Sequence, residues 1–431
     1  MPGTNGCKVG SAQIDITPPL GTELAGYFHK RIAKEIKSRL YTRALVVESG
    51  GRTVAMVAND LCGMPVQVSV LVKEKIAASC GLPPEAVMLS ATHTHTAPVL
   101  SSNPGSPLTP DPDYVAKLVE QMSDVVLKAC RCLEESSIYY GRTEAEGFSI
   151  NKLCRLKSGK EVYDLKPMKG GSDGRIGFAH SLDNSVQVFC VRDASHNVKT
   201  FAVNYACHPN SGPEIIWAEW PGDVAATISA VYGKDVPCLF LQGTAGDVDC
   251  LPGLPHEQIG RGIAGAAIMA AERAVEPMKS SPVDYRLRNV KFPRLVKTPE
   301  SDRFIVELKK RNDLGYLEKG LVDTYDAWQP EPEDSTVPIQ CLRIGETALV
   351  GLPGEIFTAL GDEIKRYSPA ANTMVVELSN SSRGYFPPIQ QAGRGGYGQW
   401  PYKSRRFMPE AAVVMTDTAI EMLWEMWDCR P

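Results

Sequence analysis

The amino-acid sequence predicts an α/β fold in which helices flank a mixed β-sheet. Short runs of aliphatic and β-branched residues alternate with longer amphipathic runs along most of the chain, and this alternation is typical of α/β proteins. Several of the short apolar runs also end directly in His, Asp, Glu or Tyr. Ligands of α/β sheets bind beyond the carboxyl ends of the strands. The second pattern therefore favours a site at the edge of the sheet.

The individual elements follow from run length and composition. Eight apolar runs are predicted as strands, at residues 41–48, 53–58, 86–90, 185–191, 200–205, 238–242, 347–351 and 373–378. Six longer runs are predicted as helices, at residues 66–79, 114–135, 224–232, 256–276, 357–366 and 409–427. The helix from residue 256 contains the stretch AGAAIMAAERAV, whose small side chains suit close packing against a sheet.

Three segments rich in proline and glycine are predicted as loops, at residues 97–113, 329–338 and 386–401. Loops longer than about 12–15 residues are uncommon unless they serve a site. We find no internal repeat, and a chain of 46.9 kDa can form one elaborated α/β unit. We therefore expect a single domain over residues 1–431, with a sub-boundary conceivable near residue 280.

Composition excludes several classes of protein. The formal net charge of −4 and the absence of a long basic run argue against a nucleic-acid surface. No stretch reaches the roughly 18 apolar residues that a membrane span needs. The expected partner is a small-molecule substrate, and whether the chain forms a homo-oligomer stays open.

The 12 cysteines are scattered, form no CxxC pair and lie in several cases inside apolar runs. This usage fits a reducing compartment better than a disulfide framework. The N-terminus MPGTNGCKVGSAQIDITPP also lacks a basic start followed by an apolar core. We therefore expect a cytoplasmic location, although a chain with a trimmed leader would look the same.

The stretch SATHTHTAPVL follows a predicted strand and carries His93 and His95. Side chains two residues apart on an extended chain lie on the same face, so both imidazoles can reach one point. Imidazole is the commonest metal ligand of proteins. The alternative is a pair of hydrogen-bonded histidines without a metal.

Other predicted strands end in residues of the same kind. His208 follows one strand and precedes a proline, which holds it extended. The further residues of this pattern are Asp60, Asp247, Asp249, Glu355 and Tyr385. An aspartate after a strand is often only a turn residue or a helix N-cap, and this reading stays open for Asp60.

Two or three histidines with one carboxylate form the ligand set of a catalytic zinc site, which leaves a position for water. Zinc lowers the pKa of such a water from 15.7 to roughly 7. The cysteines are not spaced as a ligand cluster, and calcium would require more oxygen ligands. No GxSxG elbow and no GxxxxGK[ST] phosphate loop is present.

These stretches, taken in order, resemble the neutral/alkaline ceramidases, zinc-dependent amidases that cleave N-acyl-sphingosine. The matching motifs are AQIDITPPLGTELAGY, SATHTHTAP, NYACHPNS, QGTAGDVD, GLPGEIF and ELSNSSRGY. The resemblance covers nearly the whole chain and implies the fold of the ceramidase catalytic domain. It also implies that the C-terminal immunoglobulin-like domain of those enzymes is missing.

The resemblance implies a metal-ligand set. His93 and His208 would be the histidine ligands of Zn²⁺, Glu355 would supply the carboxylate, and Tyr385 would complete the set with its phenol oxygen. His95 would lie behind these ligands, where it would orient the metal-bound water or exchange protons with it.

The resemblance also implies residues that hold the substrate. Asn151 and Lys152 stand where the family has Asn-Arg, a pair expected to hold the scissile carbonyl, and either Lys152 or Arg155 would perform this task. One departure concerns GDVDCLP, where Asp249 replaces a serine that the family requires for catalysis. This departure argues against ceramide as the substrate.

The leading hypothesis is a zinc-dependent hydrolase that cleaves an amide or related acyl bond in a small polar molecule. His95 or Asp249 would act as general base and acid, and Asp247 is a further catalytic candidate. The loops carry many cationic residues that would suit an anionic substrate or form a solvated face, namely Arg383, Arg394, Lys403, Arg405 and Arg406. The alternatives are a metal-dependent lyase or isomerase acting on a sugar acid or hydroxy acid, and a catalytically silent zinc-binding protein.

Overall fold

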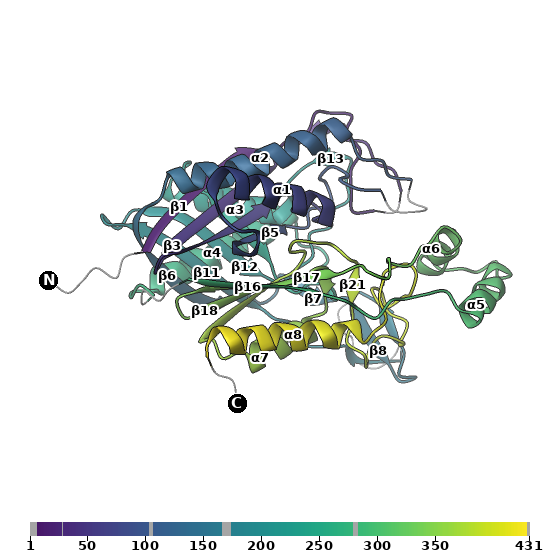
Figure 1. The fold of residues 1–431 in the computed structure, drawn as a ribbon. Helices are drawn as coiled ribbons and strands as arrows, with labels where there is room; N and C mark the ends of the chain where they lie inside the picture. Colours follow the sequence, from purple (N-terminus) through teal and green to yellow (C-terminus); the bar gives the residue numbers. More distant parts are fainter. Residues whose placement is uncertain (1–6, 28, 103–106, 166–173, 279–282, 429–431) are drawn as a thin grey trace.

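The predicted α/β architecture is confirmed by a computed structural model, in which helices cover the outer faces of two stacked sheets (Figure 1). The structure describes residues 7–27, 29–102, 107–165, 174–278 and 283–428. The conceivable boundary near residue 280 therefore lies outside the described residues. None of the described helices is long and apolar enough to cross a membrane.

The larger sheet has eight strands. They are β1 (Cys7–Asp15), β3 (Tyr41–Ser49), β4 (Arg52–Asn59), β5 (Val87–Ala91), β6 (Glu134–Glu144), β11 (Ser185–Asp193), β12 (Val198–Tyr205) and β14 (Cys238–Gln242). Their order is β14-β12-β11-β6-β1-β3-β4-β5. The pairs β4–β5 and β12–β14 are parallel and the other pairs are antiparallel, so the sheet is mixed, as predicted.

The smaller sheet has the strand order β16 (Asp284–Val290), β17 (Val337–Ile344), β18 (Thr347–Gly351) and β20 (Asn372–Val376). One face of it packs against the larger sheet through a shared apolar core that includes Leu241, Leu349 and Met374. Its other face packs against α7 (Thr358–Tyr367) and α8 (Ala411–Met426), which lie at the bottom of Figure 1.

The outer face of the larger sheet is covered by four helices. One half packs on α1 (Val66–Cys80) and α2 (Pro112–Arg131), and the other half on α3 (Glu219–Tyr232) and α4 (His256–Arg273). α4 carries the alanine-rich stretch, and Ala264, Ala267 and Ala271 are buried there. The small side chains thus allow the close packing that the sequence predicted.

A short connecting segment, residues 377–380, places the two ends of the larger sheet beside each other. The Glu377 N–H donates to the Gln242 carbonyl at the end of β14 (3.0 Å), and the Asn380 N–H donates to the Leu89 carbonyl in β5 (2.7 Å). β5 and β14 are the terminal strands of the sheet order, and β14 also contacts β3, β4 and β5. Residues that follow distant strands are therefore brought together.

Short ladders line the region where these strands end. They pair β2 (Glu35–Ile36) with β13 (Ile215–Ile216), β7 (Ser149–Asn151) with β15 (Val248–Cys250), and β19 (Glu355–Ile356) with β21 (Tyr385–Phe386). A further three-stranded sheet has the order β10 (Arg175–Phe178), β8 (Leu153–Leu156) and β9 (Glu161–Tyr163). Helices α5 (Pro299–Lys309) and α6 (Tyr316–Tyr325) project to one side (Figure 1).

Every predicted strand and helix is present, most of them with shifted bounds. One error concerns the predicted helix 114–135, which the structure ends at Arg131 and follows with a strand from Glu134. This helix begins earlier than predicted because the Asp111 carboxylate accepts from the N–H groups of Asp113 and Tyr114, and this N-cap lets Pro112 occupy the first turn.

Candidate metal centre

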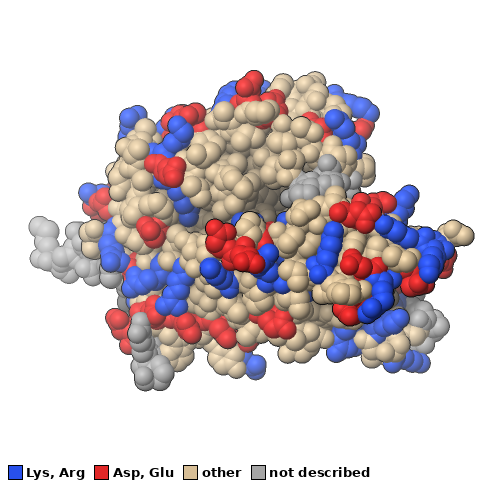
Figure 2. Space-filling view, turned by 45° about the vertical axis from the view of Figure 1, so that its right-hand side comes forward, with Lys and Arg blue, Asp and Glu red and all other residues tan. Residues whose placement is uncertain are grey.

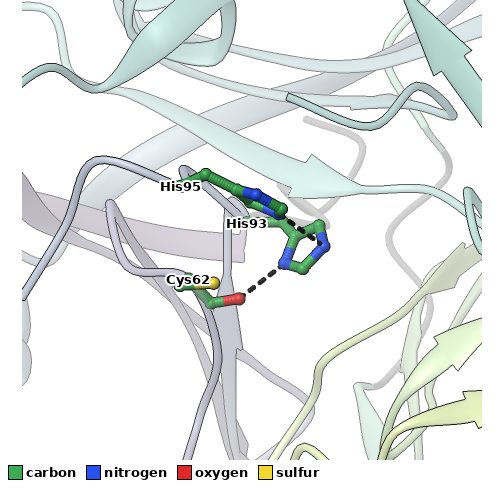
Figure 3. Close-up of side chains that lie close together, drawn as sticks. All are labelled: Cys62, His93 and His95. Carbon is green, nitrogen blue, oxygen red and sulfur yellow. Dashed lines mark hydrogen bonds between the residues drawn. The ribbon is translucent and has the colours of Figure 1, made fainter. Parts of the chain in front are cut away.

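His93 leaves the end of β5 with its imidazole fixed in orientation. Its Nδ1 lies 2.6 Å from the Cys62 carbonyl oxygen (Figure 3). Because a carbonyl only accepts hydrogen bonds, Nδ1 carries the proton, and the lone pair of the neutral ring is on Nε2. A histidine held in this way is oriented to bind a metal through Nε2.

His208 brings a second imidazole to the same point from the loop after β12. Its Nε2 lies 3.1 Å from the Nε2 of His93, and both side chains are buried. The backbone of His208 forms a parallel bridge with Asp249, so the loops that follow β12 and β14 are in register here. The two histidines, 115 residues apart in sequence, therefore face each other.

Glu355 adds a carboxylate to the two imidazoles. Its Oε2 lies 3.4 Å from Nε2 of His93 and 4.0 Å from Nε2 of His208. The ladder of β19 with β21 places Glu355 directly opposite Tyr385, and the Tyr385 phenol interacts with the Glu355 carboxylate. All four residues predicted as metal ligands thus lie in one cluster.

The geometry of three of these residues fits a divalent ion. Ligand atoms of a tetrahedral zinc site lie about 3.4 Å apart, given bonds of about 2.1 Å, and the distances among the two nitrogens and Oε2 run from 3.1 to 4.0 Å. Glu355 Oε2 is also buried and meets no donor with hydrogen-bond geometry among the described residues. An ion would satisfy this oxygen.

Without an ion, the cluster is held by charge. Burial alone would lower the pKa of His93, but the Glu355 carboxylate raises that pKa well above its ordinary value. Burial would likewise raise the pKa of Glu355, but His93 and then Lys152 lower it. A metal cation can take the place of the proton on Nε2 of His93, because each puts a positive charge beside the Glu355 carboxylate.

Cys62 is a potential ligand that the sequence argument set aside. Cys62, His93 and His95 form a second group whose ligand atoms lie within 4.8 Å of one another (Figure 3). Cys62 follows the end of β4, so it belongs to the same class of residues after strands as Asp60. Cysteine spacing along the chain could not reveal it, because its neighbours in the group come from another strand.

His95 lies behind the first three residues. Its Nε2 is 3.4 Å from Nε2 of His93. Burial, followed by the charges of His93, Arg31 and Lys152, lowers the pKa of His95 well below its ordinary value. The ring is therefore neutral near pH 7.

The structure distinguishes between the two cations proposed to hold the substrate. Arg155 donates to the buried carboxylate of Glu161 (2.9 Å), which also accepts from Gln399. The Lys152 side chain is 2% exposed and its ammonium has no hydrogen bond or ion pair within the described ranges. The Lys152 Nζ lies 5.5 Å from the ring centroid of Tyr385. The geometry favours Lys152 and assigns Arg155 to an internal ion pair.

Asp249 and Asp247 differ sharply in their surroundings. Asp249 accepts from the Tyr163 hydroxyl (3.3 Å) and from the Asn210 amide (3.2 Å), and burial raises its pKa. Asp247 accepts from the N–H and hydroxyl of Thr358 (2.7 and 2.8 Å) through one oxygen, and from Asn151 (3.0 Å) through the other. Asp247 thus anchors neighbouring segments, and the geometry does not support its predicted catalytic role.

Asp60 and four of the cationic loop residues form hydrogen bonds or ion pairs within the protein. Asp60 pairs with the buried Arg43 (2.9 Å), so it is a structural residue. Among the cationic loop residues, Arg383 and Arg406 share the buried carboxylate of Glu331. Arg394 and Arg405 donate to main-chain carbonyls. These arginines give little support to the idea of an anionic substrate, and Figure 2 shows charges of both signs interspersed.

Two buried glutamates at this site were missed in the sequence. Glu377 accepts from the N–H groups of Ala245 (3.2 Å) and Ile356 (2.8 Å), and burial raises its pKa to about 8. Glu219 accepts from the loops that carry the histidines. Glu377 was counted inside the predicted strand 373–378, and Glu219 follows no apolar strand-like run.

Comparison with known proteins places this fold among the neutral ceramidases. A crystal structure of neutral ceramidase from Pseudomonas aeruginosa superposes with a TM-score of 0.78 at 20% identity, covering 99% of this chain and 75% of that one. A structure described as ceramidase complexed with C2 gives a TM-score of 0.78 at 19% identity, with coverage of 99% and 76%. The chain therefore has the fold of a ceramidase-type hydrolase.

Residues 7–212 match the family described as neutral/alkaline non-lysosomal ceramidase, N-terminal. The resemblance recognised in the sequence is thereby confirmed for this part of the chain. No curated protein matches the chain.

Proposed function

We propose that this chain is a zinc-dependent hydrolase that cleaves an amide or related acyl bond in a small polar molecule other than ceramide. One observation carries the proposal, namely the convergence of His93, His208 and Glu355 within 3.1–4.0 Å from three separate strand ends. A ligand set of two imidazoles and one carboxylate leaves a position open for water. The hydrolase fold of the ceramidases supports the same reading.

In this proposal, His93, His208, Glu355 and Tyr385 would hold the ion, which can expand to five-coordination and so would still accept a water. A bound zinc ion supplies Lewis acidity, which lowers the pKa of a water and polarises a carbonyl. The Cys62 carbonyl keeps Nδ1 of His93 protonated and so keeps Nε2 available.

The surrounding residues carry the protons and the charge. His95, neutral through burial, accepts a proton from the water as its oxygen bonds to the carbonyl carbon. The Lys152 ammonium stabilises the negative charge that develops on the carbonyl oxygen. Asp249, whose pKa burial raises, donates a proton to the leaving nitrogen as the C–N bond breaks. The products are a carboxylic acid and an amine.

The substrate class follows from Asp249 and its neighbours. Asp249, Asn210 and Tyr163 form a hydrogen-bonded polar group beside the histidines, where the ceramidases have a serine. A buried carboxyl group disfavours an apolar chain in contact with it, because its polar atoms would lose partners. The arrangement favours a compact, polar substrate.

Metal analysis tests the proposal directly. The purified protein is expected to hold about one zinc per chain, and His208→Ala is expected to lose it. His180→Ala is the matched control, since His180 pairs with Asp362 away from the cluster, and it should keep its zinc. Stoichiometric zinc in His208→Ala would refute the ligand assignment.

Activity is tested on a panel of N-acyl amides with zinc present and removed. Release of an amine that depends on zinc supports the hydrolase. A zinc-loaded protein that instead releases an alkene from a hydroxy acid would identify a lyase. A protein that holds zinc and converts no member of either panel would identify a binding protein.

A further inference from the structure

Two buried residues of opposite charge, Arg31 and Glu219, bind the same pair of histidine-bearing loops. Both side chains are almost completely buried. Glu219 begins α3 and has a φ of +52°, a left-handed conformation that is unfavourable for a residue with a side chain. Strain of this kind persists only where the surroundings hold the residue in place.

Glu219 binds the main-chain N–H groups of the two loops. One carboxylate oxygen accepts from the N–H of His95 (2.5 Å). The other accepts from the N–H of Ser211, three residues after His208. The Thr94 hydroxyl lies 3.0 Å from the first oxygen. An ionised carboxylate that accepts from backbone N–H groups forms hydrogen bonds about twice as strong as neutral ones.

Arg31 binds the main-chain carbonyls of the same loops. Its Nη2 donates to the carbonyl of His95 (2.6 Å), and its Nη1 donates to the carbonyls of Gly212 and Pro213 (3.2 Å each). The guanidinium also stacks over the Tyr27 ring at 4.3 Å, and the Tyr27 hydroxyl donates to the Asn210 carbonyl (3.1 Å). Arg31 therefore reaches both loops at once through its forked head group.

We infer that Arg31 and Glu219 are positioning residues that together set the separation between His93 and His208. Glu219 accepts from main-chain N–H groups of both loops, and Arg31 donates to main-chain carbonyls of both loops. Each loop is therefore bound by both side chains. The inference rests on the metal centre proposed above. It extends that proposal, since neither residue is among the proposed metal ligands or catalytic groups.

The chemistry of the two side chains makes the inference testable with small changes. Glutamine has the shape of glutamate but only one acceptor oxygen, so Glu219→Gln turns an NH₂ group toward one of the two amides. Methionine keeps the apolar stem of arginine and lacks every donor, so Arg31→Met releases the carbonyls of His95, Gly212 and Pro213, and also that of Ala25. Each variant therefore loosens one loop against the other without emptying the site of its ligands.

Two matched controls come from similar contacts elsewhere. Arg343 also donates to two main-chain carbonyls and stacks on an aromatic ring, that of Trp427. The Asp183 carboxylate also accepts from the N–H and the hydroxyl of Ser185, and it pairs with the ammonium of Lys365 on another element. Arg343→Met and Asp183→Asn should cost stability in the same way as the two test variants, but they leave the histidine loops untouched.

The first readout is zinc affinity, measured by competition with a chromophoric chelator. Loss of a residue that orients metal ligands typically weakens metal binding about 10–100-fold, and we expect this for Glu219→Gln and Arg31→Met. The two controls should bind zinc within about 2-fold of the parent protein, whatever their melting temperatures. The double variant should lose less than the product of the single losses, because both residues hold the same loops.

The second readout does not need a metal. Crystal structures of the metal-free parent and of Glu219→Gln give the distance between Nε2 of His93 and Nε2 of His208, which is 3.1 Å here. An increase with displaced loops supports the inference. Unchanged histidine positions together with unchanged zinc affinity would overturn it. If the parent protein binds no metal, the proposed function fails, and the crystal structures alone then decide the role of the two residues.

Discussion

Backbone strain gathers around the histidines. His93, Glu219, Leu378 and Asn380 are non-glycine residues with φ between +52° and +71°. His93 is a proposed ligand, Glu219 binds its loop, and the other two lie in the segment that joins the ends of the larger sheet. Such conformations cost on the order of 1–3 kcal/mol each and cluster where function requires a fixed geometry. The strained residues therefore lie around the same centre that the distances among His93, His208 and Glu355 identify.

Lys152→Met tests the role of the buried ammonium. Removal of a group that stabilises the developing oxyanion is expected to lower kcat about 100- to 1,000-fold, with zinc content unchanged, because Lys152 is not a ligand. Arg155→Met should have a much smaller effect, since Arg155 pairs with Glu161. Steady-state kinetics on the best amide of the panel measure both. Equal losses in the two variants would contradict the assignment of Lys152.

Lys73, on α1, offers a prediction about pH and stability. Burial lowers its pKa from 10.5 to about 7. The unfolded chain thus binds more protons than the folded one between pH 7 and 10.5, so this residue makes the folded state more stable as pH rises through that range. Below pH 7 the folded state bears the full cost of burying the charged Lys73 ammonium.

We therefore expect Lys73→Met to be more stable than the parent protein at pH 7 by up to about 5 kcal/mol, with the difference shrinking towards pH 10. Urea unfolding of both proteins at pH 7, 8.5 and 10 measures this difference. A constant difference across the three pH values would show that Lys73 keeps its charge in the folded state.

At the scale of elements, long elements were predictable and short ladders were not. Strands β3 and β14 and helix α7 follow from their own sequences, because a buried strand or an amphipathic helix leaves a local pattern. The ladder of β19 with β21 has two residues in each strand, which is too short for any period. Strand β17 was missed because its run contains Pro338, which is rare inside sheets.

Element stability is tested at the N-cap of α2. The Asp111 carboxylate accepts from two N–H groups of the first turn, and Asp111→Ala should lower the free energy of unfolding by about 0.5–2 kcal/mol. Asp124→Ala, on the same helix away from the cap, is the control and should change it by less than about 0.5 kcal/mol. Chemical denaturation measures both, and equal effects would refute the capping role.

At the scale of the whole molecule, the site joins segments that are remote in sequence. His93, His208 and Glu355 follow β5, β12 and β18, and the first two of these strands lie in different halves of the larger sheet. The segment 377–380 bonds to both terminal strands of that sheet. An ion bound by these three residues would connect the larger sheet to the smaller one.

Zinc should therefore stabilise the entire fold. Free zinc at 100- to 1,000-fold above its Kd is expected to add about 2.7–4.1 kcal/mol to the free energy of unfolding. Thermal unfolding with zinc and with a chelator measures this gain. His208→Ala should show no such gain, and a zinc response that survives in His208→Ala would locate the ion elsewhere.

The sequence by itself determined the fold class, the main helices and strands, and the residue types of the centre, because hydrophobic periodicity and strand-end chemistry are local properties. It also revealed the ceramidase resemblance through short motifs around those same residues. Only the tertiary structure decided which polar residues meet. It separated Lys152 from Arg155 and Asp249 from Asp247, and it added Cys62, Arg31 and Glu219. The reason is physical, since the task of a buried charge depends on partners that the fold brings from distant segments, and no local pattern records those partners.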